Sequence, residues 1–111
     1  MNLDGLRMYV SATAAVGVVS ADTRLELLQK GPRVLGRYKG GNVQRGCLAG
    51  RLTGTELTFR YAQREASGEI HAGRSTCDVV RLNDRRLRIL EHFTWTTRAG
   101  SGTNVFDEVP V

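Results

Sequence analysis

The sequence predicts an all-β fold, an antiparallel meander of about eight strands that closes into a small barrel or barrel-like sandwich. Apolar and polar residues alternate with a period of two along most of the chain, which is typical of strands with one buried face. Turn residues interrupt this alternation roughly every ten positions, as in all-β domains. The 13 glycines against two prolines indicate many tight turns and bulges. A length of 111 residues fits a single domain, 1–111.

The alternation defines eight expected strands joined by short turns. The strands span residues 6–13, 18–29, 33–39, 42–52, 55–63, 68–80, 85–97 and 102–109. The clearest turn signals are Gly31-Pro32, Gly40-Gly41, Thr53-Gly54, Ser67-Gly68 and Asn83-Asp84. Short connections favour pairing between successive strands. The apolar stretch 12–18 is short and contains Gly17, so we expect the first connection there and no helix.

The same alternation predicts which residues of three strands face inward. In the fifth strand they are Leu57, Phe59, Tyr61 and Gln63. In the fourth strand they are Gln44, Gly46, Leu48, Gly50 and Leu52. In the seventh strand they are Leu87, Ile89, Glu91, Phe93 and Trp95. Gly46 and Gly50 leave space for rings such as those of Tyr38 and Phe59, and they let the strand bend as a closing barrel requires.

The sixth strand breaks the pattern. Ile70 and Ala72 are expected to face inward, but the same phase would bury the charged Arg74 and Asp78. A bulge at Gly73 would reset the phase. The residues then turned inward would be Ser75, Cys77 and Val79.

Glu91 is the most informative residue for function, because the alternation places its carboxylate on an apolar inward face. A buried charge must be paired, hydrogen-bonded, hydrated or protonated. Glu91 is therefore either a polar anchor in a ligand cavity or a structural tie, hydrogen-bonded to Tyr38, Tyr61 or an arginine. The candidate ligand-binding residues are Tyr38, Tyr61, Ser75, Glu91 and Trp95. The alternative for the aromatic residues among them is a plain core.

The net charge of +5 raises a second possibility, a surface that binds nucleic acid or another anionic partner. The candidate residues surround one hairpin and are Arg81, Arg85, Arg86 and Arg88. A second basic group surrounds another hairpin and comprises Arg33, Arg37, Lys39 and Arg45. The competing interpretation is that these arginines are solvated, since the outer faces offer few aromatic side chains for base stacking.

The sequence offers no pattern for catalysis, a metal or a cofactor. His71 and His92 are both expected on outer faces, and Cys47 and Cys77 are expected on opposite faces, outward and inward, so no catalytic or ligand set forms on one surface. Asp107 or Glu108 could join Glu91 inside only if the last strand has the right phase. Neither a secretory signal nor a membrane-spanning run of roughly 20 apolar residues is visible. We therefore expect a cytoplasmic protein without a membrane association, whose oligomeric state the sequence leaves open.

The spacing of glycines and aromatics resembles a family of small uncharacterised bacterial β-barrel proteins of the calycin type. The matching pattern begins Tyr38-x-Gly40-Gly41-x-Val43-x-x-Gly46-x-Leu48-x-Gly50 and continues with Leu57-x-Phe59-x-Tyr61, Gly68-Glu69-Ile70 and Arg86-Leu87-Arg88-Ile89-x-Glu91-x-Phe93-x-Trp95. The resemblance covers roughly residues 18–109 and implies a calycin-like barrel. Some members of that family are labelled N-acetylglutamate synthase.

The residues of this chain disagree with that label. An acetyltransferase of the usual kind holds a pyrophosphate on an Arg/Gln-x-x-Gly-x-Gly/Ala loop at the start of a helix. The nearest stretch here, residues 44–50, has its glycine one place too early and lies within an expected strand. The sequence therefore favours a barrel that binds a small molecule without catalysis. The alternatives are a basic surface module and a structural or oligomer-forming domain.

Overall fold

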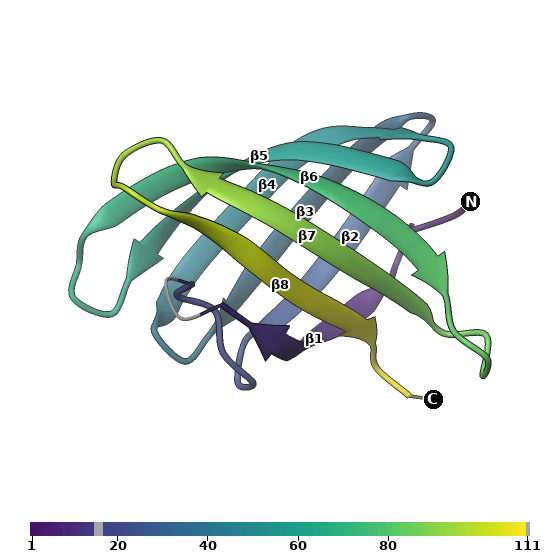
Figure 1. Ribbon diagram of the computed structural model, residues 1–111, viewed down its shortest axis with the longest axis horizontal. Helices are drawn as coiled ribbons and strands as arrows, with labels where there is room; N and C mark the ends of the chain where they lie inside the picture. Colours follow the sequence, from purple (N-terminus) through teal and green to yellow (C-terminus); the bar gives the residue numbers. More distant parts are fainter. Residues whose placement is uncertain (15–16, 111) are drawn as a thin grey trace.

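The computed structural model describes residues 1–14 and 17–110, which form eight antiparallel strands (Figure 1). The strands are β1 (Arg7–Thr13), β2 (Arg24–Lys30), β3 (Arg33–Gly40), β4 (Val43–Thr53), β5 (Glu56–Glu65), β6 (Ile70–Arg81), β7 (Leu87–Trp95) and β8 (Ser101–Glu108). Each strand pairs with the next, and β1 also pairs with β8, so the meander closes into a barrel. The all-β meander barrel expected from the sequence is confirmed. Within the described residues, no helix is long and apolar enough to span a membrane.

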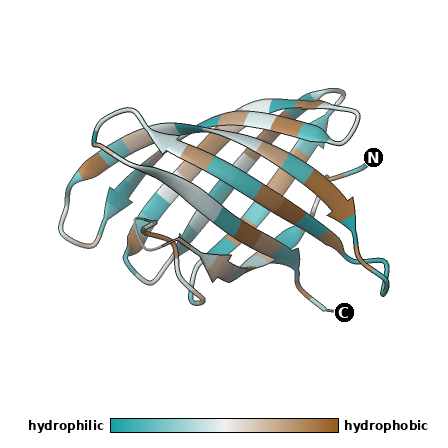
Figure 2. Cartoon of the chain, viewed as in Figure 1, coloured by the Kyte–Doolittle hydropathy of each residue, from teal (hydrophilic) through white to brown (hydrophobic). Residues whose placement is uncertain are grey.

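Apolar and polar residues alternate along the strands (Figure 2), and the apolar residues of one face form the buried core. The predicted inward faces of the fifth and seventh strands are confirmed, since all their residues are buried. The N-terminal segment closes the end of the barrel that holds the β4–β5 turn. Leu3 is fully buried there, and its backbone N–H donates to Gln29 Oε1 over 2.7 Å. The opposite end holds the β1–β2, β3–β4, β5–β6 and β7–β8 connections, and the buried polar residues Gln63 and Glu65 form a polar rim there.

The second strand begins later than expected, at Arg24 instead of residue 18. Thr23 explains the late start. Its side chain is fully buried and accepts a hydrogen bond from the Ser20 backbone N–H, while its hydroxyl donates to the Gly40 carbonyl. These bonds form a turn, so the backbone groups that a strand would pair are used locally.

The bulge expected at Gly73 is absent, because β6 pairs with β5 without a register shift from Ile70 to Asp78, and its pairing with β7 begins in register at Gly73. Ser75, Cys77 and Val79 do face inward, as predicted. Ile70 and Ala72, however, belong to the outer phase, and the Ile70 side chain is 62% exposed. His71 accordingly lies in the inward phase, at the polar rim, and not on the outer face expected for it.

An irregularity occurs instead in β4, where the pairing with β5 shifts between Val43 and Arg45. As a result Val43 is buried and Gln44 is exposed, the reverse of the expectation for this end of the strand. The predicted role of Gly46 is confirmed. A β-carbon at this position would collide with the Tyr38 ring, so only glycine lets the ring lie flat against β4.

Candidate binding site in the barrel interior

A polar cluster lies in the middle of the apolar interior. β6, β7 and β8 pair side by side and contribute Ser75, Glu91 and Asn104. Ser75 Oγ donates to Glu91 Oε2 over 2.6 Å, and Asn104 Nδ2 donates to Glu91 Oε1 over 2.9 Å. All three side chains are buried. Glu91 is thus hydrogen-bonded within the wall. The structural interpretation expected Tyr38, Tyr61 or an arginine as its partner, but the partners are Ser75 and Asn104.

Burial raises the pKa of Glu91 above its ordinary value, because the charged carboxylate loses contact with water. The hydrogen bonds from Ser75 and Asn104 oppose this effect but do not cancel it. The carboxyl group is therefore easier to protonate than a solvated glutamate. In its protonated form it could donate as well as accept a hydrogen bond.

A cavity of about 40 Å³ lies beside this cluster. Its wall combines apolar and aromatic residues with a few polar groups, and it is formed by Gly17, Val18, Val19, Leu25, Leu27, Tyr38, Leu48, Leu57, Phe59, Tyr61, Gln63, Ile89, Glu91, Phe93, Trp95, Asn104 and Phe106. A water molecule needs roughly 10–15 Å³ on this measure, so the cavity has room for a few waters or a very small polar molecule. A larger ligand must displace part of the wall.

The Tyr61 hydroxyl is the one buried side-chain polar atom of the described residues that has no hydrogen-bond partner there. The ring lies over Gly73, where any β-carbon would collide with it. Burial, and next the charge of Glu91, raise the pKa of Tyr61, so the hydroxyl stays a donor. Leaving such a donor unpaired costs roughly 1–3 kcal/mol, and the hydroxyl belongs to a residue of the cavity wall.

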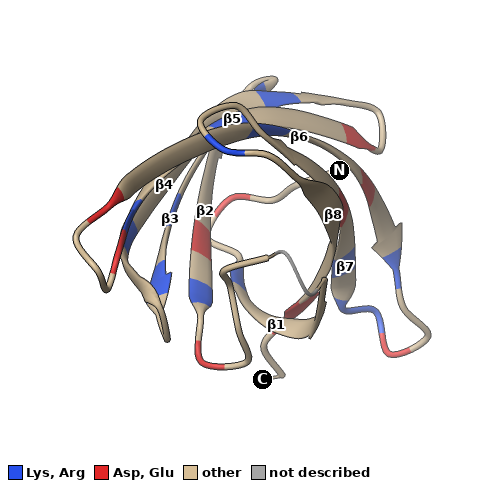
Figure 3. Cartoon of the chain, turned by 60° about the vertical axis from the view of Figure 1, so that its left-hand side comes forward, with Lys and Arg blue, Asp and Glu red and all other residues tan. Residues whose placement is uncertain are grey.

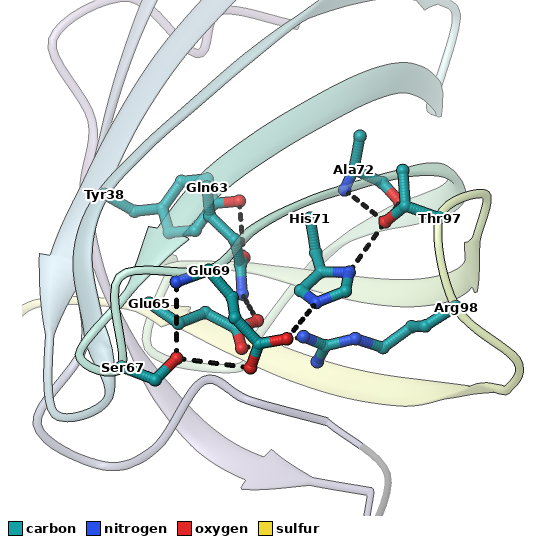
Figure 4. Close-up of polar contacts among 9 residues, drawn as sticks. All are labelled: Tyr38, Gln63, Glu65, Ser67, Glu69, His71, Ala72, Thr97 and Arg98. Carbon is teal, nitrogen blue, oxygen red and sulfur yellow. Dashed lines mark hydrogen bonds and ion pairs between the residues drawn. The ribbon is translucent and has the colours of Figure 1, made fainter.

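The polar rim of the barrel continues from the cavity through a chain of side-chain contacts (Figure 4). Tyr38 donates to Gln63 Oε1 over 2.9 Å, and Gln63 Nε2 donates to Glu65 over 3.0 Å. Arg98 donates to the other Glu65 oxygen over 2.7 Å, and its guanidinium lies 4.7 Å from the Trp95 ring centre. Burial would raise the pKa of Glu65, but the hydrogen bonds from Arg98 and Gln63 outweigh it and hold the pKa below its usual value.

Glu65, Glu69 and His71 at this rim have possible metal-ligand atoms within 4.8 Å of one another. His71 Nδ1 lies 2.8 Å from Thr97 Oγ1, and His71 Nε2 lies 3.5 Å from Glu69 Oε1. A metal ion here would have to compete with the Arg98 guanidinium for Glu65. These side chains therefore form a network of hydrogen bonds and ion pairs together with Arg98 and Thr97.

The structure brings four of the five candidate ligand residues to one cavity, namely Tyr38, Tyr61, Glu91 and Trp95. Ser75 lies behind the wall and orients Glu91. Sequence analysis missed Asn104 and the cavity-lining role of Gln63. Both face inward in the period-two pattern of their strands, so the phase of β8, with Phe106 inward, could have revealed Asn104.

The arginines predicted around the β6–β7 hairpin are accompanied by acids. Arg86 pairs with Asp84 at 2.7 Å, and Arg88 pairs with Asp107 at 2.7 Å. Arg81 donates to the Arg85 carbonyl. Asp107 thus lies in the outward phase of β8, where it is nevertheless buried, and does not join Glu91 inside.

Comparison with known proteins places this chain in a family. A family described as avidin-like protein matches residues 1–109. No curated protein and no solved structure gives a significant match. The match agrees with the calycin-like barrel expected from the sequence and extends over all eight strands. The chain belongs to the avidin-like protein family.

Proposed function

We propose that this protein binds a small molecule inside the barrel, without catalysing a reaction on it. The Tyr61 hydroxyl carries the proposal, because it is a buried donor without a partner among the described residues and belongs to a residue that lines the cavity. An eight-stranded barrel has an interior just wide enough to be filled by side chains or to hold one small ligand. Membership of the avidin-like family and the aromatic wall of the cavity support the same role.

The polar groups define the chemistry of the ligand. The Tyr61 hydroxyl would donate to a ligand oxygen or nitrogen, and Glu91 would accept from a ligand N–H or O–H. An ionised Glu91 disfavours an anionic group beside it. The expected ligand is a neutral or cationic compound with a donor next to an acceptor, such as an amide or an alcohol, and an apolar part that packs on Phe59, Phe93 and Trp95.

Tyr61→Phe and Tyr38→Phe form a matched pair that tests this proposal. Both rings are buried on the same cavity, but only the Tyr38 hydroxyl has a partner among the described residues, Gln63. Tyr61→Phe should keep or raise the melting temperature of the free protein, since it removes an unpaired donor. Tyr38→Phe should lower the free energy of unfolding by about 1–3 kcal/mol, because the buried Gln63 Oε1 then loses the hydrogen bond that Tyr38 donates.

The ligand is sought by thermal shift with a library of small neutral and cationic polar compounds. A compound that stabilises the wild type by mass action should lose this effect in Tyr61→Phe and in Glu91→Leu. The proposal fails if Tyr61→Phe destabilises the free protein as much as Tyr38→Phe and the library yields no stabilising compound. The barrel would then be a structural domain.

A further inference from the structure

The outward-facing residues of β2–β6, here named the arginine face, carry most of the positive charge of the protein. They include ten of the 16 Lys and Arg residues and only three of the 11 Asp and Glu residues, which gives +7 on this face and −2 on the rest of the chain. The ten cations are all exposed and are Arg24, Lys30, Arg33, Arg37, Lys39, Arg45, Arg51, Arg60, Arg64 and Arg74. Figure 3 shows their blue bands recurring along β2, β3 and β4.

The strand register places these cations directly opposite one another. The five cross-strand pairs of like charge are Arg24–Lys39, Lys30–Arg33, Arg33–Arg51, Arg45–Arg64 and Arg60–Arg74. Side chains that are directly opposite have β-carbons about 5 Å apart, and like charges in such pairs destabilise a sheet. Of the ten cations, only Arg37 has a carboxylate partner among the described residues, Glu26 at 3.1 Å. An anion between two paired cations would convert their repulsion into attraction.

Two surface grooves lie among these side chains. One, of about 660 Å³, is lined by Arg24, Arg37, Lys39, Arg45 and Arg64 together with one carboxylate, that of Glu26, and uncharged neighbours. The other, of about 420 Å³, is lined by Arg51, Arg60 and Arg74, and the exposed hydroxyls of Thr58, Thr76 and Thr94 border it. Guanidinium groups bind phosphate with two parallel hydrogen bonds, and hydroxyls also donate to phosphate oxygens.

We propose that the arginine face binds the phosphate backbone of double-stranded nucleic acid, without sequence specificity. The repeated cation pairs match a partner with many phosphates better than a single small anion. The described residues place no exposed Phe, Tyr or Trp side chain on this face. The face therefore lacks the aromatic side chains on which proteins stack the bases of a single strand. Contact with the phosphates on the outside of a duplex does not need them. This inference is independent of the interior site and does not use the hairpin arginines.

The salt dependence of binding to a fluorescent DNA duplex tests the proposal. The five cation pairs overlap at Arg33, so they neutralise about four to five phosphates, and the logarithm of the affinity should fall with the logarithm of salt concentration with a slope near −4. Arg60→Gln with Arg74→Gln removes one whole pair. This variant should bind about tenfold more weakly at 50 mM salt, and its slope should be shallower by about one.

The matched control is Arg81→Gln with Arg85→Gln, which changes the net charge equally at exposed positions off the face. It should leave the slope and affinity close to those of the wild type. The melting temperature of the Arg60/Arg74 variant should be unchanged or raised, which shows that the barrel is intact. The proposal is overturned if the wild type does not bind the duplex at 50 mM salt, or if both variants lose affinity equally. Binding to vesicles rich in anionic phospholipid with none to the duplex would also overturn it.

Discussion

At the scale of single residues, the geometry of Glu91 agrees with both of the interpretations that the sequence left open. It is hydrogen-bonded to Ser75 and Asn104 in the wall, and it also borders the cavity. Its hydrogen bonds stabilise the carboxylate, whereas burial favours the neutral acid. The protein therefore keeps an ionisable group in its interior whose charge depends on pH.

Glu91→Gln is expected to change how stability depends on pH. A carboxyl group whose pKa is raised in the folded state binds more protons folded than unfolded, so its contribution falls as pH rises above the ordinary value of 4.5 and through the folded pKa. Glutamine cannot ionise. The stability of Glu91→Gln relative to the wild type should therefore increase with pH over this window, by about 1.4 kcal/mol for each unit of the shift. Urea unfolding at pH 4 to 8 measures the difference, and a constant difference would contradict the prediction.

The inward position of Glu91 could be predicted because one unbroken alternation runs along β7. Its partners could not, because they depend on the register of β7 against β6 and β8, which turn lengths alone do not fix. The lack of a hydrogen-bond partner for the Tyr61 hydroxyl among the described residues could not be predicted from the sequence either. Whether a buried donor finds a partner depends on the direction of the side chain, and sequence patterns specify only the face.

At the scale of strands, one glycine sets the shape of the cavity wall. Gly46 lies opposite Tyr38 in the β3–β4 pairing and makes room for its ring. The ring in turn holds its hydroxyl on Gln63 and closes part of the cavity. The sequence predicted this close approach, because glycine at an inward strand position serves no packing purpose of its own.

Gly46→Ala should therefore force the Tyr38 ring to move. Overpacking of this kind costs about 1–3 kcal/mol, measured as a lower midpoint of denaturant unfolding. The penalty should largely disappear when Gly46→Ala is made in a protein that already carries Tyr38→Leu, because the alanine methyl group then has no ring to collide with. Equal penalties in both backgrounds would show that the backbone of β4, and not the ring, resists the substitution.

The strands that sequence analysis placed incorrectly share one cause, local register. The late start of β2 depends on hydrogen bonds of Thr23 to the nearby Ser20 N–H and to the distant Gly40 carbonyl. The inversion of Val43 and Gln44 comes from a shift in the β4–β5 pairing, and β6 avoids a bulge because Gly73 accommodates Tyr61. Alternation predicts faces within a regular strand, but a shift of one residue depends on contacts between strands.

At the scale of the whole molecule, the barrel depends on the seam where β8 meets β7 and β1. Arg88 and Asp107 form a two-bonded ion pair across β7 and β8, at 2.7 and 3.0 Å. The hydrogen bonds from Arg88 hold the pKa of Asp107 below its usual range, although burial opposes them. The pair thus stabilises the closed barrel while Asp107 is ionised.

Arg88→Met should destabilise the protein by about 1–3 kcal/mol at pH 7, because it leaves the buried Asp107 carboxylate unpaired. A lowered pKa contributes stability above its ordinary value of 3.8 and loses it as pH falls through the folded pKa. The effect of the substitution should therefore shrink at pH 3. Arg37→Met is the control, since the Arg37–Glu26 pair is exposed and should contribute less than about 1 kcal/mol. A larger effect in the control than at the seam would refute this account.

The pairing of β1 with β8 also determines when, during synthesis of the chain, the barrel can close around its interior. Met8 pairs with Glu108, so the first and last strands become neighbours only after almost the whole sequence has been synthesised. Ribosomes add roughly 5–20 residues per second, and contacts this distant along the chain form late in folding. Asn104 and Phe106, which complete the cavity wall, are on the same last strand. A nascent chain that lacks β8 would therefore expose apolar strands without a closed interior, and a ligand could enter the barrel only after translation has passed β8.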